Sequence, residues 1–232
     1  MLATSAQGQS WDVDDLDSNC RQLVVVESVR GSPARHAGPT GCAVAGPSVF
    51  QVVVSGWNRE TSDWVEAIPK MQGVIGRHGF AVTHGKREGD GCTPRGFFRL
   101  GMAFGRPVEI ATRLNYQRMT EADTWVDDPT SDQYNRWVRG KPQAKSYERM
   151  LREDGQYDLG IVIEYNTDPV KPHAGSAIFA HIWRDRNTPT SGCVAVDATH
   201  MKRLLEWLDA RKSPMIRLGP NDANEAMGPD IK

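Results

Sequence analysis

The sequence predicts a mainly β protein, either a sandwich or a partly closed barrel, with one clear helix late in the chain. Short apolar, β-branched runs recur along the chain, and each is bounded by Gly, Pro, Asn or Asp. One segment near the C-terminus has apolar residues at the spacing of a helix. Residues 111–157 are polar and aromatic and interrupt the pattern. These observations favour one β domain that carries an insertion.

The expected strands are the short apolar runs that turn residues bound on both sides. In chain order they are Leu23–Val26, Val49–Val54, Phe80–Thr83, Phe97–Leu100, Gly160–Tyr165, Ala177–Ile182 and Cys193–Val196. A weaker helix is expected from Ser62 to Ile68, ahead of Pro69. We expect residues 1–20 to be a flexible segment and residues 21–232 to form a single domain.

The clear helix is expected between Asp197, which can cap it, and Lys212. Its apolar face holds Met201, Leu204, Leu205 and Leu208. Arg211 and Lys212 suit the C-terminal end of the helix dipole. Pro214 would stop the helix, and Met215–Leu218 then returns as a strand. We expect this helix to pack behind the strand that begins at Cys193.

The composition excludes several classes of protein. The chain has 232 residues, a formal net charge of −1, 39% hydrophobic and 25% charged residues, as in soluble globular proteins. Near-zero charge argues against nucleic acid as the main partner. No apolar run is long enough to span a membrane. Residues 1–10 lack the regions of a signal peptide, which fits an intracellular protein or a mature secreted chain whose signal has been removed.

The four cysteines, Cys20, Cys42, Cys92 and Cys193, include no CxxC pair, so zinc ribbons and thioredoxin-type motifs are unsupported. Cys20 and Cys42 flank the first strand and could form a disulfide in an oxidising compartment, although sequence does not fix the pairing. A metal site built from His84, His173, His181 and two of these cysteines would match no standard zinc spacing. We therefore expect neither a metal nor an organic cofactor.

The chemistry is expected in the segment from His181 to Val196, HIWRDRNTPTSGCVAV. A histidine ends one strand and Cys193 begins the next, so paired strands would place the two side chains together. The imidazole could then take the thiol proton and produce a nucleophile. Gly192 lets the backbone approach a ligand, and its amide and that of Cys193 could face an oxyanion.

A structural interpretation of the same residues is simpler. Free cysteines are often inert core residues, and a histidine on a strand is often a satisfied structural group. The Ser191-Gly192-Cys193 turn, between an apolar strand and a capped helix, favours catalysis over this interpretation.

The segment resembles the catalytic signature of the L,D-transpeptidases of the YkuD type. That signature is a histidine, a loop, then Ser or Thr, His, Gly, Cys and an apolar residue. Thr190, Gly192 and Cys193 match it, as does His181. Ser191 departs from it, because the family usually has a second histidine there. Ala195 also stands where Asn or Arg is common, and the loop after His181 is shorter.

With these departures, the segment resembles a divergent branch of the family that has a Pro-Thr-small-Gly-Cys turn. Further elements of that branch are found at Lys86–Phe98 (KREGDGCTPRGFF), Trp125–Pro129 (WVDDP), Tyr134–Asn135 and Gly175–Phe179 (GSAIF). The likeness extends over roughly residues 80–200. Together the elements are specific, whereas each alone would be weak.

The resemblance implies a YkuD-like fold and a cysteine-dependent L,D-transpeptidase. Its catalytic residues would be Cys193, His181, Gly192 and Ser191, and its substrate would be the stem peptides of peptidoglycan. Such a reaction implies a periplasmic or otherwise extracytoplasmic location. An amine acceptor would give a cross-link, and water would give a carboxypeptidase or amidase. The oligomeric state is left open.

Five residues are candidates for substrate binding. They are Arg184, Trp183, Thr190, His84 and Tyr134. Arg184 suits a substrate carboxylate, because a guanidinium binds one with two hydrogen bonds. Trp183 would share the face of His181 if the strand continued, whereas a turn would free Arg184. His84 could orient His181, and Tyr134 could wall a groove or belong to a local core.

Other functions remain as alternatives. A sortase also has His before Cys, but expects a more distant histidine and an arginine on the strand soon after the cysteine. Papain-like and NlpC-type hydrolases have Cys before His, which is the reverse of the order here. A non-catalytic module that binds the cell wall would keep the aromatic groove but tolerate the loss of Cys193.

Overall fold

The computed structural model describes residues 2–4, 10–12, 16–29 and 50–220. Its strands are β1 (Leu2–Thr4), β2 (Ser10–Asp12), β3 (Gln22–Ser28), β4 (Gln51–Glu60), β5 (Asp63–Val74), β6 (Gly96–Gly105), β7 (Tyr116–Arg118), β8 (Asp123–Val126), β9 (Trp137–Arg139), β10 (Tyr147–Arg149), β11 (Leu159–Ile163), β12 (Phe179–Ile182), β13 (Val194–Val196) and β14 (Met215–Leu218). Helix α1 spans Ala198–Trp207, and a 3-10 turn, η1, spans Ala210–Lys212.

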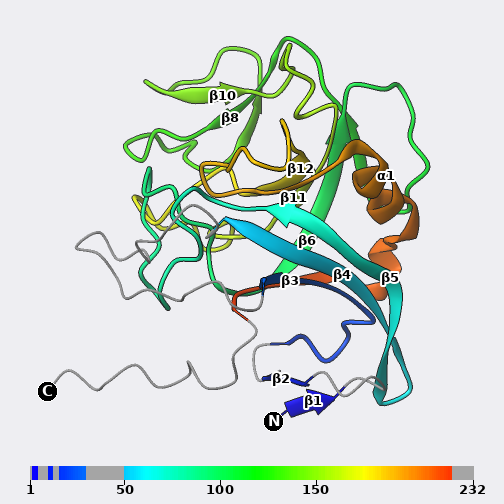
Figure 1. The fold of residues 1–232 in the computed structure, drawn as a ribbon. Helices are drawn as coiled ribbons and strands as arrows, with labels where there is room; N and C mark the ends of the chain where they lie inside the picture. The colour runs from blue at the N-terminus through cyan, green and yellow to red at the C-terminus, as the bar shows by residue number, and fades with distance from the viewer. Residues whose placement is uncertain (1, 5–9, 13–15, 30–49, 221–232) are drawn as a thin grey trace, which may run out of the picture.

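The strands form a partly closed barrel, which confirms the predicted mainly β fold. In the largest sheet the order is β11-β12-β13-β5-β4-β3-β14-β6-β7, and β11 also pairs with β6. That pairing joins the two ends of an eight-strand sheet, and β7 lies beside β6 (Figure 1). Closure leaves fewer strand edges unpaired.

Two large hydrophobic clusters lie beside two smaller ones in the described residues. The main one joins barrel residues such as Val54, Ile68 and Ile161 to the apolar face of α1. The second surrounds Phe104 and Phe179 and includes Cys193. The nucleophile candidate therefore lies at the edge of the core and not on an exposed loop.

Helix α1 begins as expected. The Asp197 carboxylate accepts a hydrogen bond from the His200 amide at 3.0 Å, and α1 contacts β11 and β12. The helix ends at Trp207, however, and not at Lys212. The Gln22 side chain donates to the Trp207 carbonyl at 2.9 Å and accepts from the Asp209 amide at 2.8 Å. These bonds satisfy groups that a further helical turn would have used.

Two predicted elements are wrong. Residues 62–68 are not helical, because from Asp63 onward they belong to β5, which forms a hairpin with β4 across Thr61 and Ser62. Cross-strand bonds and the burial of Trp64 and Ile68 outweigh the local helical pattern. Residues 80–83 form no strand either, since Phe80 makes only an isolated bridge to Thr93.

The insertion has its own structure. Strands β8, β9 and β10 form a small sheet in the order β10-β8-β9, which Figure 1 shows above the barrel. At its centre the buried Asp123 carboxylate accepts bonds from Thr120, Trp137 and Arg139. Trp125 packs edge-to-face on Phe179 of the barrel, with ring centroids 4.9 Å apart. We call this three-stranded sheet of β8, β9 and β10 the lid sheet, for its place above the barrel.

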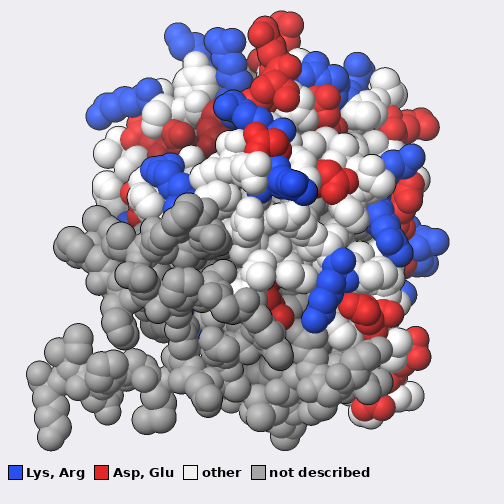
Figure 2. Space-filling view, in the orientation of Figure 1, with Lys and Arg blue, Asp and Glu red and all other residues white. Residues whose placement is uncertain are grey.

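The remaining expectations concern the termini, membranes and charge. Much of residues 1–20 lies outside the described residues, and β1 pairs with β2 where that segment is described. No helix in the described ranges is long and apolar enough to cross a membrane. On the described part of the face in Figure 2, Lys and Arg are interspersed with Asp and Glu.

The Cys20–Cys42 disulfide that the sequence left open is not formed, because Cys20 is free. Cys20 is a free, buried thiol whose sulfur lies 3.2 Å from the Gln22 carbonyl, to which it donates. Cys92 is the cysteine that is disulfide-bonded, and Cys42 lies outside the described residues. The packing of Cys20 in the small cluster with Trp57 and Trp64 explains why it behaves as a core residue.

Candidate active site

His181 and Cys193 lie on neighbouring strands of the barrel. Strands β12 and β13 pair in parallel, with His181 opposite Ala195. Because side chains alternate along a strand, Cys193 and Ala195 share the face of His181. The Phe179 amide also donates to the Cys193 sulfur, at 3.4 Å. The loop after β12 therefore returns the chain to the same end of the sheet and brings the two side chains to one face.

The imidazole of His181 has a defined orientation. Nδ1 lies 2.8 Å from the Ile182 carbonyl oxygen, which can only accept, so Nδ1 carries the proton. Nε2 then holds the lone pair that a general base needs. Burial lowers the pKa of His181 to about 4, so the ring is neutral near pH 7.

The thiol of Cys193 is also held neutral. It donates to the Ala177 carbonyl at 3.2 Å, and the residue is 8% exposed. Burial raises the pKa of Cys193 to about 12, and the nearby Glu148 carboxylate adds to the rise. Within the described part of the chain, no hydrogen bond joins this thiol to His181. A resting thiolate–imidazolium pair would require a lowered pKa of the Cys193 thiol. The structure instead raises that pKa.

The turn before Cys193 is tightly packed. Gly192 has φ +148°, and a Cβ there would lie 2.9 Å from the Cys92 carbonyl oxygen. Thr190 Oγ1 donates to the Cys193 carbonyl at 2.6 Å and accepts from the Gly192 amide at 3.1 Å. The Gly192 amide, expected at an oxyanion, is thus already bonded. Ser191 is exposed, and its hydroxyl accepts from Arg77 at 3.2 Å.

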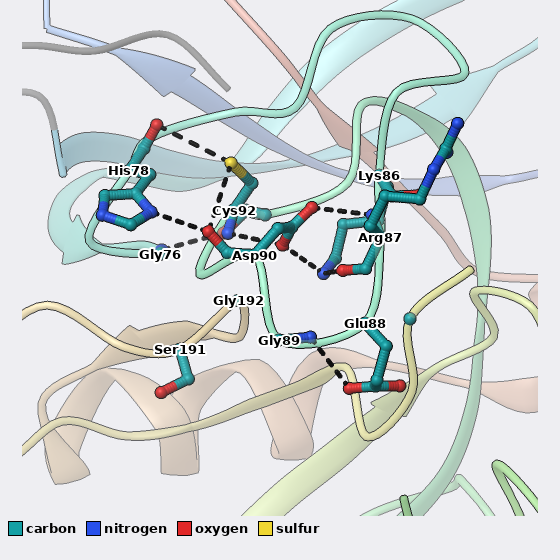
Figure 3. Close-up of polar contacts among 12 residues, drawn as sticks. Gly76, His78, Lys86, Arg87, Glu88, Gly89, Asp90, Cys92, Ser191 and Gly192 are labelled. Carbon is teal, nitrogen blue, oxygen red and sulfur yellow. Dashed lines mark hydrogen bonds and ion pairs between the residues drawn. The ribbon is translucent and has the colours of Figure 1, made fainter. Parts of the chain in front are cut away.

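The loop at residues 86–92 lies beside this turn (Figure 3). Lys86 is buried, and its Nζ lies 2.6 Å from Asp90 Oδ1 and 2.8 Å from the Arg87 carbonyl. Asp90 also accepts from the backbone amides of Arg87 and Cys92, at 2.7 and 2.9 Å. These contacts give Asp90 a structural role in the loop. Glu88 points away from this cluster (Figure 3).

His181 and Cys193 open on a cavity of about 420 Å³. Four other residues expected at the site line it: Arg184, Thr190, Ser191 and Gly192. Strand β12 ends at Ile182, so the turn that was expected to free Arg184 is present. The cavity holds side chains of both signs, and these belong to Lys86, Glu88, Asp127, Glu148, Arg152 and Arg184.

Three expected binding residues do not line the cavity. Tyr134 is buried, and its hydroxyl donates to Glu88 and accepts from the Gly175 amide. Glu88, which lines the cavity, also accepts a hydrogen bond from Ser176 at 2.7 Å. Tyr134 therefore contributes to the cavity wall only by holding Glu88 in place. His84 is exposed at a left-handed turn, φ +59°. The Trp183 amide donates to the Val196 carbonyl at 2.8 Å, which extends the β12–β13 contact.

The cavity is also lined by Glu148, Arg152 and Tyr157, which no pattern in the sequence singles out. They come from the lid sheet and the segment that follows it. The polar-aromatic composition of residues 111–157 indicated an insertion, but it contains no periodicity from which to choose the inward-facing residues. The described residues hold no group of three or more His, Cys, Asp or Glu placed to bind a metal ion.

A neutral histidine and a buried cysteine on paired strands of a β barrel, opening on one cavity, form a site of the thiol–imidazole class. Residues 67–217 match the YkuD family, the L,D-transpeptidase catalytic domain. The chain belongs to this family, and the predicted resemblance is confirmed. Searches of curated proteins and of solved structures found no significant match. The features of a divergent branch stay a prediction.

Proposed function

We propose that the protein is a peptidoglycan L,D-transpeptidase that forms an acyl-enzyme on Cys193 with His181 as general base. The observation that carries this proposal is the shared strand face of the two residues at the cavity. Membership of the family supplies the reaction class and the peptidoglycan substrate.

The chemistry follows from the neutral resting pair. As the sulfur attacks the carbonyl carbon of a stem peptide, its proton passes to His181 Nε2. The imidazolium then protonates the leaving amine, and the C–N bond breaks to leave a thioester on Cys193. An acceptor amine gives its proton to His181 and attacks the thioester, which forms the new amide and restores the thiol. Water in place of the amine gives hydrolysis.

Two further roles are part of the proposal. We assign the stabilisation of the oxyanion to the Cys193 amide, since the Gly192 amide already donates to Thr190. Arg184, at the cavity, is proposed to bind a substrate carboxylate through its guanidinium. Thr190 holds the turn through its two hydrogen bonds and is proposed to shape the cavity mouth.

We also propose that the protein acts outside the cytoplasm, where peptidoglycan is built. The disulfide bond of Cys92 supports this location, because disulfides persist in oxidising compartments.

Intact-mass measurement tests the acyl-enzyme. The protein is incubated with soluble stem peptides prepared from peptidoglycan, and we expect a gain equal to the acyl fragment. Cys193→Ala should show no gain. Cys20→Ala is the matched control, because Cys20 is the other free, buried thiol of the described chain and should not matter. Acylation that survives in Cys193→Ala would contradict the proposal, and binding without any mass gain would favour a wall-binding module.

A second measurement identifies the product. Purified peptidoglycan is treated with wild type and with Cys193→Ala, and the muropeptides are then analysed by mass. New cross-linked muropeptides in the wild-type sample alone would support transpeptidation, whereas shortened stems alone would indicate that water is the acceptor.

A further inference from the structure

Two residues from the lid region form a hydrogen-bonded pair beside the catalytic base. Glu148 lies on β10, and Tyr157 lies just before β11. The Tyr157 hydroxyl donates to Glu148 Oε2 at 2.6 Å. The ring of Tyr157 meets the His181 ring edge-to-face, with centroids 5.2 Å apart and planes at 74°.

The Tyr157 ring is confined on several sides. It is 5% exposed and packs edge-to-face on Phe104 and Phe179, at 5.8 and 5.7 Å between centroids. The Arg152 guanidinium lies 5.0 Å from its centroid. A phenylalanine would fill this apolar space equally well, so packing alone does not account for the hydroxyl. The hydroxyl is the point at which the ring is tied to the lid sheet.

The polar partners of the His181 ring are backbone groups. Its hydrogen bond to the Ile182 carbonyl fixes the tautomer, and the Gln156 backbone is a second partner. Hydrogen bonds at the edge of the ring do not by themselves prevent the imidazole from tilting about them. The neighbouring Tyr157 ring limits that tilt. Misplacement of a catalytic group by about 1 Å can cost about a hundredfold in rate.

We propose that Glu148 and Tyr157 are positioning residues that hold the His181 ring in its reactive orientation, so that the lid sheet supports the base. This inference rests on the proposed role of His181. Glu148 fixes the Tyr157 hydroxyl, and the Tyr157 ring fixes the imidazole. The half-buried Glu148 carboxylate in turn accepts the hydroxyl's hydrogen bond, which offsets part of the cost of removing that carboxylate from water.

The first test is a double-mutant cycle on the rate of Cys193 acylation by soluble stem peptides. Tyr157→Phe and Glu148→Ala should each lower kcat about tenfold and change KM less than about twofold, because the substrate contacts remain. The double variant should be no slower than either single variant, since both break one hydrogen bond. Glu148→Gln should recover most of the rate, because its amide oxygen can accept the hydroxyl.

Arg149→Ala is the matched control, because Arg149 is the exposed neighbour of Glu148 on β10 and should leave kcat unchanged. A double variant slowed by the product of the two single effects would overturn the inference. So would a Glu148→Gln variant as slow as Glu148→Ala, or a Tyr157→Phe variant with wild-type kcat. Tyr157→Phe and Glu148→Gln decide the matter even if Glu148→Ala does not fold.

A second readout does not depend on turnover. In an NMR spectrum of the imidazole protons, Tyr157→Phe should shift or broaden the His181 resonances and leave those of His200, on α1, unchanged. Unchanged His181 resonances would overturn the inference. If the wild type forms no acyl-enzyme but the His181 resonances respond, the proposed function fails and the positioning contact stands.

Discussion

Burial sets the protonation of His181 and Cys193, the proposed base and nucleophile. It disfavours charge on each of them, so it raises the pKa of Cys193 to about 12 and lowers that of His181 to about 4. A thiolate–imidazolium pair is therefore not the resting state. The proton moves as the sulfur attacks, when the forming bond removes charge from the sulfur.

The burial of His181 predicts a pH dependence of stability. Its folded pKa, about 4, lies below its ordinary value of 6.5. The unfolded chain therefore takes up this proton first as pH falls, and stability is lost between about pH 6.5 and pH 4. The shift corresponds to about 3 kcal/mol in the free energy of unfolding. Urea unfolding at pH 7 and at pH 4 measures how much the free energy of unfolding decreases between the two. In His181→Gln this decrease should be smaller than in the wild type by about this amount. Equal losses in both proteins would show that His181 is not buried in its neutral form.

Ser191 is expected to matter little to the reaction. Its hydroxyl is exposed and bound to Arg77, so it neither takes a proton nor supports the Cys193 carbonyl. Ser191→Ala should slow acylation less than about tenfold, whereas removal of an oxyanion donor costs about a hundredfold or more. His181→Ala and Cys193→Ala should abolish it, because the two residues act as one unit. The assignment of the base is falsified if folded Ser191→Ala is as inactive as Cys193→Ala.

At the scale of elements, the lid sheet meets the barrel through aromatic packing and through the Asn135 side chain, which bonds Tyr165 and Ala177. Trp125 meets Phe179, and Trp137 meets Phe104 at 6.1 Å between ring centroids. The three short strands of the sheet hydrogen-bond to one another and not to the barrel strands. Such an element can open locally at a lower free energy than the barrel.

Hydrogen exchange tests this property of the lid sheet. Amides of β8, β9 and β10 should exchange faster than those of β4, β5 and β11, and should slow when stem peptides are bound. The comparison is internal to one protein, so the barrel strands are the control. Exchange as slow as in the barrel, with no response to substrate, would count against a lid.

At the scale of the whole molecule, barrel closure determines where the site lies. Strand β11 pairs with both β12, which carries His181, and β6, which leads into residues 111–157. The loop at residues 86–92 lies beside the Ser191–Gly192 turn (Figure 3), and the Cys92 carbonyl lies close to Gly192. Segments far apart in sequence thus build one cavity.

The disulfide of Cys92 should contribute to global stability. Its reduction should lower the free energy of unfolding by about 3 kcal/mol, because the cross-link restricts the unfolded chain. Urea unfolding with and without a reductant measures the difference. A Cys92→Ala variant is the control, since its stability should not respond to the reductant. An equal response in both proteins would mean that the effect does not arise at Cys92.

The sequence by itself determined the β class, the main helix and its cap, and the juxtaposition of His181 with Cys193. These depend on local patterns, namely apolar runs between turn residues and a Gly-Cys turn after an apolar strand. The same patterns failed at residues 62–68, where pairing with β4 outweighed local propensity.

Only the tertiary structure decided which other residues reach the cavity and how His181 and Cys193 are protonated. Tyr134 proved to be a support for Glu88, while Glu148 and Tyr157 came from a segment without periodicity. The pKa values of Cys193 and His181 follow from burial, which depends on how distant strands and the lid sheet pack together. No local pattern in a sequence encodes that packing, because it is the sum of many contacts between segments far apart in the chain.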